Sequence, residues 1–152
     1  MRSLAGLCGL RIGRWGGVVA AIVSLALFPH VTGSQSPQVI EILADHDSRF
    51  KMAGLKEPMI TVHAGEMVTL RITAVKAKNR NRDGSIHGFA LLHAKDRKRV
   101  PGWDLLLKPG VQEFMLTAPT EPGEYVVVCT VICSDDHEGM HMRFVVLPAE
   151  GS

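Results

Sequence analysis

Residues 129–140 read CTVICSDDHEGM, and the interpretation of this 152-residue chain starts from them. Four potential metal ligands share this stretch with the spacing C-x3-C-x3-H-x2-M: Cys129, Cys133, His137 and Met140. Thiolates, an imidazole and a thioether are soft or borderline donors, and this combination of donors suits copper. The stretch therefore predicts a copper site.

The flanking residues predict that the four ligands share one loop between two strands. Residues 123–129 are rich in β-branched and aromatic side chains and predict a strand that ends at Cys129. Residues 142–147 predict the next strand, and the aspartates and glycine between the two favour turns. His87, in the tetrapeptide IHGF at 86–89, lies at the start of a different predicted strand. It can close the site from the side.

The number of cysteines separates two kinds of copper site. A mononuclear blue-copper site uses one cysteine, two histidines and a weak methionine, so Cys129 and Cys133 together exceed its needs. Two cysteines can instead bridge two copper ions, each completed by one histidine. A disulfide between the cysteines is the alternative in an oxidising compartment. It would close a very short loop, stabilise little and leave the histidines and Met140 without a role.

Together the loop and the IHGF motif resemble the CuA domain of cytochrome c oxidase subunit II and the matching domain of nitrous oxide reductase. The resemblance covers roughly residues 38–148. It implies a cupredoxin fold and a binuclear CuA centre with two copper ions per chain. By position, Cys129 and Cys133 are the implied bridging thiolates, and His87 and His137 each bind one copper. Met140 is the implied axial ligand on one side, and the backbone carbonyl of Val131 is the axial ligand on the other.

Two positions depart from the family pattern. Ser134 follows the second cysteine, where the oxidases usually have glycine. The segment Asp83-Gly84-Ser85 only approximates the aspartate that often precedes the first histidine. Both departures concern redox tuning and docking more than the ligand set.

The resemblance implies electron transfer without a catalytic site in this chain. Electrons would come from a c-type cytochrome and pass to a heme-copper oxidase. Two alternatives stay open: a stand-alone periplasmic cupredoxin that carries electrons, and a copper-delivery or storage protein that holds one Cu(I). We expect Asp135, Asp136 and Glu138 to form an acidic rim that steers a basic cytochrome. The sequence contains no recognisable nucleophile–base pair, phosphate loop or dinucleotide fingerprint.

The rest of the chain predicts an all-β domain, a cupredoxin-like Greek-key β-sandwich. Short runs of β-forming residues separated by turn signals carry this prediction. The predicted strands are residues 39–44, 59–63, 67–75, 86–92, 111–116, 123–129 and 142–147. Residues 47–54 are expected to hold a short helix, and residues 102–107 are interpreted as an insertion. Trp103 and Tyr125 are expected in the core, and His46, His63, His93 and His141 are not expected to be ligands.

The N-terminal segment is predicted to be separate from this domain. Arginines precede an apolar run at residues 15–28, which predicts a signal peptide or a single membrane anchor over residues 1–33. Residues 34–37 are expected to form a short linker, and residues 38–150 are expected to form the CuA-type domain that the resemblance implies. The arginines place the domain outside the cytoplasm, in the periplasm or on the outer face of the cytoplasmic membrane. The formal charge of +2 includes three leader arginines, so a nucleic-acid partner is not expected.

Overall fold

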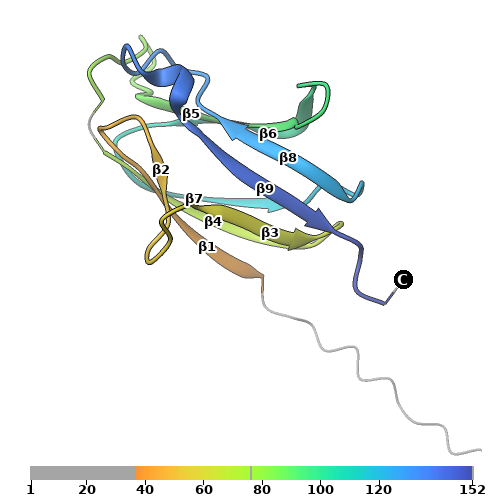
Figure 1. Cartoon of the computed structure of the whole chain (residues 1–152). Helices are drawn as coiled ribbons and strands as arrows, with labels where there is room; N and C mark the ends of the chain where they lie inside the picture. The colour runs from red at the N-terminus through yellow and green to blue at the C-terminus, as the bar shows by residue number, and fades with distance from the viewer. Residues whose placement is uncertain (1–36, 76, 152) are drawn as a thin grey trace, which may run out of the picture. The chain divides into compact units, whose positions relative to one another are not determined.

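The computed structural model describes residues 37–75 and 77–151, which form two β-sheets packed face to face (Figure 1). The four-stranded sheet has the order β2-β1-β4-β7, made of β1 (Gln38–Ala44), β2 (Phe50–Lys51), β4 (Met67–Ala74) and β7 (Gly110–Thr117). The five-stranded sheet has the order β3-β9-β8-β5-β6, made of β3 (Met59–His63), β5 (His87–His93), β6 (Arg99–Leu107), β8 (Gly123–Val128) and β9 (His141–Leu147). The all-β sandwich is confirmed.

Both sheets are mixed, because each contains one parallel pair of strands. Strand β1 runs parallel to β4, and β3 runs parallel to β9, while the other pairs are antiparallel. The predicted leader at residues 1–33 lies outside the described residues. Within residues 37–75 and 77–151, no helix has the length and apolar character needed to cross a membrane.

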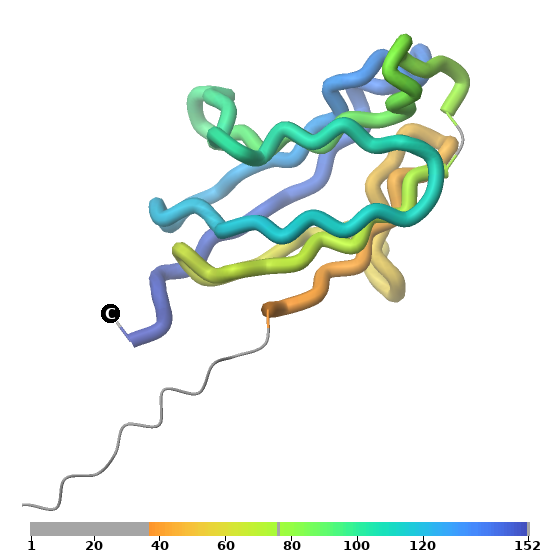
Figure 2. Tube along the Cα trace, turned by 180° about the vertical axis from the view of Figure 1, so that it is seen from behind, coloured from red at the N-terminus to blue at the C-terminus, as the bar shows by residue number. Residues whose placement is uncertain are grey.

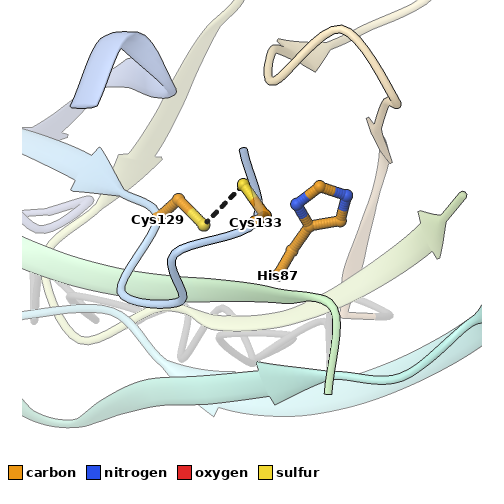
Figure 3. A group of neighbouring side chains, drawn as sticks. All are labelled: His87, Cys129 and Cys133. Carbon is orange, nitrogen blue, oxygen red and sulfur yellow. Dashed lines mark hydrogen bonds between the residues drawn. The ribbon is translucent and has the colours of Figure 1, made fainter. Parts of the chain in front are cut away.

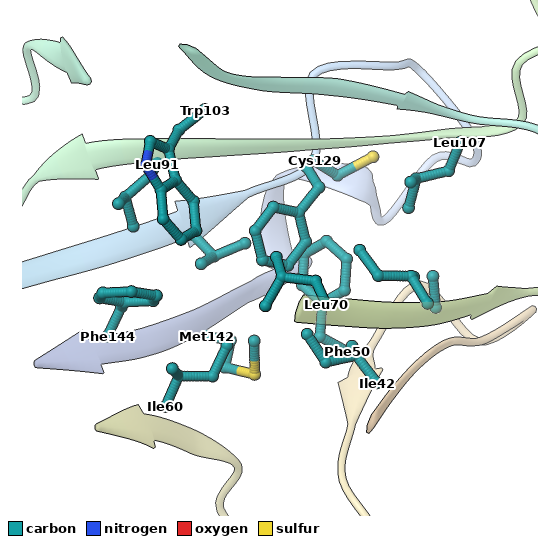
Figure 4. Close-up of a cluster of buried hydrophobic side chains, with 14 of the residues drawn as sticks. Ile42, Phe50, Ile60, Leu70, Leu91, Trp103, Leu107, Cys129, Met142 and Phe144 are labelled. Atoms are coloured by element: carbon teal, nitrogen blue, oxygen red, sulfur yellow. The ribbon is translucent and has the colours of Figure 1, made fainter. Parts of the chain in front are cut away.

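The core fills the space between the two sheets (Figure 4). Successive side chains of a strand point to opposite faces of the sheet. Strand β4 therefore buries Val68, Leu70 and Ile72 and leaves the residues between them partly exposed. Trp103 from β6 packs edge-to-face on Phe144 from β9, with ring centroids 5.2 Å apart. Burial of the Trp103 and Tyr125 side chains confirms their predicted core positions. Cys129 lies at the edge of the same core, so this cysteine is held by well-packed neighbours.

All seven predicted strands are present, but the helix expected at residues 47–54 is absent and strands β2 and β6 were not predicted. Residues 47–54 form no helix; they form a turn and the two-residue strand β2, whose Phe50 is buried against β1. Residues 102–107 belong to β6, which pairs with β5. Pro101 and Gly102 concealed this strand in the sequence. Because β6 lies at the edge of its sheet, a proline without an N–H group is tolerated there.

Three loops meet at one end of the sandwich (Figures 1 and 2). They are the β1–β2 loop at residues 45–49, the segment before β5 and the loop at residues 129–140. The backbone N–H of Asn79 donates to the carbonyl of Cys133 at 3.0 Å. The hydroxyl oxygens of Ser48 and Ser134 lie 2.5 Å apart. The 129–140 loop is therefore held by both neighbouring loops.

Candidate metal centre

The 129–140 loop begins directly after β8 and is closed at its neck by a backbone hydrogen bond. The N–H of Cys129 donates to the carbonyl of Met140 at 3.0 Å. Inside the loop, the carbonyl of Val131 accepts from the N–H of Cys133 at 2.7 Å and lies 3.2 Å from Cys129 Sγ. The loop thus turns the Val131 carbonyl toward the thiols.

The two cysteines of the loop are unlinked and face each other (Figure 3). Their Sγ atoms are 3.8 Å apart, far beyond the length of about 2.05 Å that a disulfide requires. Cys133 is fully buried and Cys129 is 9% exposed. Burial raises the pKa of the Cys129 thiol to about 11, so without metal this group is protonated at neutral pH. Metal binding there must displace a proton.

His87 completes a cluster with the two thiols. A ring nitrogen of His87 and the two Sγ atoms lie within 4.8 Å of one another. His87 Nε2 lies 3.2 Å from the carbonyl of Val75. A carbonyl can only accept, so Nε2 carries the proton and Nδ1 presents a lone pair. Burial lowers the pKa of His87, which favours this neutral, ligand-competent form.

The environment of His87 Nδ1 is the clearest sign of a missing partner. Among the described residues, this is the buried side-chain nitrogen or oxygen that lacks any hydrogen-bond partner. A buried polar atom without a partner is unfavourable, and a bound ion, ligand or water would satisfy it. An unprotonated imidazole nitrogen beside two thiols is a donor set that fits copper.

Gly88 allows the loop to approach β5 closely. Its N–H donates to Cys129 Sγ at 3.3 Å. A Cβ atom at position 88 would lie 2.7 Å from the backbone nitrogen of Thr130, closer than real Cβ contacts allow. The glycine in the IHGF motif therefore serves the contact between β5 and the loop.

His137 and Met140 lie near Cys129. They border an open hollow of about 350 Å³ that Cys129 and Glu138 also line. His137 is partly exposed on the short 3₁₀ turn η1 (His137–Gly139), and its Nδ1 lies 3.1 Å from the carbonyl of Ser134. Met140 is 1% exposed. The structure thus gathers His87 and both cysteines tightly, and it places His137 outside that cluster.

One contact of the site was not predicted. Ser48, from the β1–β2 loop, is buried, and its hydroxyl oxygen lies 3.9 Å from Cys133 Sγ. Sequence reasoning placed Ser48 inside a predicted helix, and a lone serine 85 positions away from Cys133 gives no local signal.

The histidines not expected as ligands lie outside the cluster. His46 and His141 are exposed. His63 Nδ1 lies 2.8 Å from the carbonyl of Pro148, and the ring of His93 packs on Tyr125 with centroids 4.7 Å apart. His93 is therefore partly buried by a core residue.

The predicted acidic rim is partly neutralised. Asp135, Asp136 and Glu138 are all exposed, but Lys78 Nζ lies 2.5 Å from an Asp135 carboxylate oxygen. The hydrogen bond with Lys78 lowers the pKa of Asp135, so this carboxylate is charged and paired. Asp136 and Glu138 supply the remaining negative charge.

Comparison with known proteins gives matches in structure only. No protein-family model matches the chain, and no curated protein matches its sequence. Auracyanin A, a "blue" copper protein from Chloroflexus aurantiacus, superposes with a TM-score of 0.53 at 22% identity, covering 74% of this chain and all of auracyanin A. The fold is cupredoxin-like.

Two further matches are weaker. Auracyanin B gives a TM-score of 0.49 at 20% identity, covering 75% of this chain and 92% of auracyanin B. A chain of a heme-copper terminal oxidase gives a TM-score of 0.48 at 18% identity, covering 72% of this chain and 65% of the oxidase chain. At these identities the likeness concerns the fold, so the case for function rests on the residues of the site.

Proposed function

We propose that this protein transfers electrons through a binuclear copper centre of the CuA type, held by the 129–140 loop and His87. One observation carries the proposal: two buried, unlinked thiols 3.8 Å apart share their surroundings with an unpartnered imidazole nitrogen. A mononuclear blue-copper site uses one cysteine, so the second would have no role in it. Two thiols that face each other are suited to bridging two metals.

The proposed ligands divide between two sides of the cysteine pair. Cys129 and Cys133 would be the ligands that the two copper ions share, His87 would bind one ion, and His137 would bind the other. The Val131 carbonyl, 3.2 Å from Cys129 Sγ, and Met140 supply the weak axial donors. Bound copper supplies a one-electron couple. The packed β-sandwich holds the ligands in place, and a rigid ligand set keeps the reorganisation on electron transfer small.

The partner is proposed to approach the tip of the 129–140 loop. Ile132 lies between the axial carbonyl and the second cysteine and is 67% exposed. A cytochrome whose heme edge contacted Ile132 would lie within a few residues of both thiols. Following the motif resemblance, the donor is a c-type cytochrome and the acceptor is a heme-copper oxidase. The domain would act outside the cytoplasm, exported or anchored by residues 1–33.

The position of His137 favours copper delivery as a second candidate. Because His137 lies outside the tight cluster, His87, Cys129 and Cys133 could hold a single Cu(I) among three donors. Such a protein would release its metal to an acceptor and would not cycle electrons.

Copper stoichiometry distinguishes the two candidates. We would load the reduced full-length protein with excess copper, remove unbound metal and measure copper per chain. The electron-transfer proposal predicts two copper ions per wild-type chain and their loss together in Cys133→Ser. One Cu(I) per chain, with no optical band after oxidation, would replace the proposal with copper delivery.

A further inference from the structure

Ser48 occupies a backbone conformation that serine rarely adopts. Its φ is 56°, in the left-handed region where glycine and asparagine are the usual residues. Holding a residue other than glycine in this conformation costs about 1 kcal/mol or more of folding free energy. Residues with such strained backbone conformations concentrate at functional sites. Ser48 is also 2% exposed, so its hydroxyl must find partners inside the protein.

The partners of Ser48 form a chain of groups that ends at a sulfur. The backbone N–H of Asp136 donates to Ser134 Oγ at 3.1 Å. Ser134 Oγ lies 2.5 Å from Ser48 Oγ, which lies 3.9 Å from Cys133 Sγ. An amide N–H can only donate and a metal-bound thiolate can only accept. With Cys133 as a thiolate, Ser48 must donate to the sulfur, and Ser134, which accepts from Asp136, must then donate to Ser48.

The two thiols have polar neighbours from different elements. Gly88 in β5 donates its N–H to Cys129 Sγ at 3.3 Å. The hydroxyl oxygen of Ser48 in the β1–β2 loop lies 3.9 Å from Cys133 Sγ. Hydrogen bonds around a cysteine sulfur tune the redox potential of a copper site, and partners of metal ligands commonly change affinity 10- to 100-fold.

We propose that Ser48 donates a hydrogen bond to the Cys133 thiolate and, backed by Ser134, sets the redox balance of the metal site. The inference rests on the proposed copper function and assigns a role to a positioning residue outside the ligand motif. Ser134, which stands where the oxidases usually have glycine, gains a physical role as the group that orients the Ser48 hydroxyl. A donor to this sulfur reduces its negative charge and favours Cu(I).

Two substitutions of Ser48 separate the hydroxyl from the backbone. Ser48→Ala removes the hydroxyl and keeps a Cβ at φ 56°, whereas Ser48→Gly removes the hydroxyl and relieves the strain. We expect both to weaken Cu(I) binding about tenfold, measured by competition with a chelator. For a one-electron couple, a tenfold loss of Cu(I) affinity with an unchanged Cu(II) affinity lowers the midpoint potential by about 59 mV. Ser134→Ala should lower the midpoint potential by a smaller amount, because Ser48 keeps its own hydroxyl in this variant.

Ser85→Ala is the matched control. Ser85 is equally buried, but its hydroxyl bonds with Asp83 and Asn81. We expect this variant to retain the wild-type potential even where its thermal stability falls. Equal Cu(I) affinity and potential in wild type, Ser48→Ala and Ser48→Gly would overturn the inference. If the wild type holds one Cu(I), the binuclear proposal fails, and the Cu(I) affinities of the same variants still decide the role of Ser48.

Discussion

His87 and His137 both lie near Cys129, but their environments are opposite. His87 opens β5, is completely buried, and has Nε2 tied to Val75 with Nδ1 left without a partner. His137 lies on a short 3₁₀ turn, is partly exposed, and borders an open hollow. The sandwich thus prepares one side of the site in advance and leaves the other side to the loop.

This difference assigns separate tasks to the two sides. The buried side fixes ligand geometry and excludes water, because a strand and the core hold it. The exposed side is where a partner or a small ligand can reach the site. If both sides hold copper, the cysteines are the groups that they share.

Removing a shared thiol should have the largest effect. Cys133→Ser keeps the size of the side chain but replaces a thiolate with a poor copper ligand, so neither copper should be retained. Copper analysis after chelation checks this, with circular dichroism to confirm the β-sandwich. Retention of a full copper complement would show that Cys133 is not a bridging ligand.

The two histidines should respond differently to replacement by glycine. Both variants lose a ligand, but added imidazole should restore the optical spectrum of His137→Gly, because the hollow beside position 137 is open. It should fail to restore His87→Gly, whose position is sealed in the core. Titration with imidazole, followed by absorption, makes the comparison. Rescue of His87→Gly with no rescue of His137→Gly would reverse the assignment of the buried and exposed sides.

Gly88→Ala should strain the buried side. The added Cβ would meet Thr130, including its backbone nitrogen at 2.7 Å, so β5 and the loop must separate. Overpacking of this kind costs about 1–3 kcal/mol in the free energy of unfolding. Chemical denaturation of the metal-free protein measures it. Thr130→Ala added to Gly88→Ala should relieve only part of the loss, because the backbone contact remains; full recovery would place the strain in the Thr130 side chain alone.

Charge changes on the exposed side should have the smallest effect. Asp136→Asn and Asp135→Asn should each slow reduction by a basic cytochrome c at low salt, because each makes the rim one charge unit more positive and Asp135→Asn also leaves Lys78 without its partner. Neither should matter at high salt, since the screening length is about 8 Å at physiological ionic strength and shorter above it. Stopped-flow rates across a salt series test this. Rates that ignore salt in every variant would remove charge steering from the account.

The sequence predicted the features of the site that depend on residues close together in the chain. Cys129 and Cys133 lie four residues apart on one loop, so their proximity follows from local geometry. The motif around His87 predicted a strand that begins at the site, and β5 does begin there. The structure brings His87, Cys129 and Cys133 together. The roles of these three residues and of Val131, His137 and Met140 as ligands stay predictions.

The remaining features depend on contacts between distant segments. Ser48 reaches Cys133 across 85 positions, and Lys78 reaches Asp135 across 57, so no local pattern marks either pair. The sequence favours a helix for the turn that carries Ser48. Only the pairing with β1, which buries Phe50, makes this segment a strand, and that pairing leaves no local signal. Strand β6 was missed because an edge strand tolerates the proline and glycine that usually end one.

The central claim is that two copper ions share one electron through the two thiols. Electron paramagnetic resonance of the fully copper-loaded, oxidised protein tests it most directly. We predict a signal whose hyperfine splitting comes from two equivalent copper nuclei, together with a purple colour. A blue protein whose splitting comes from a single copper nucleus would contradict the claim.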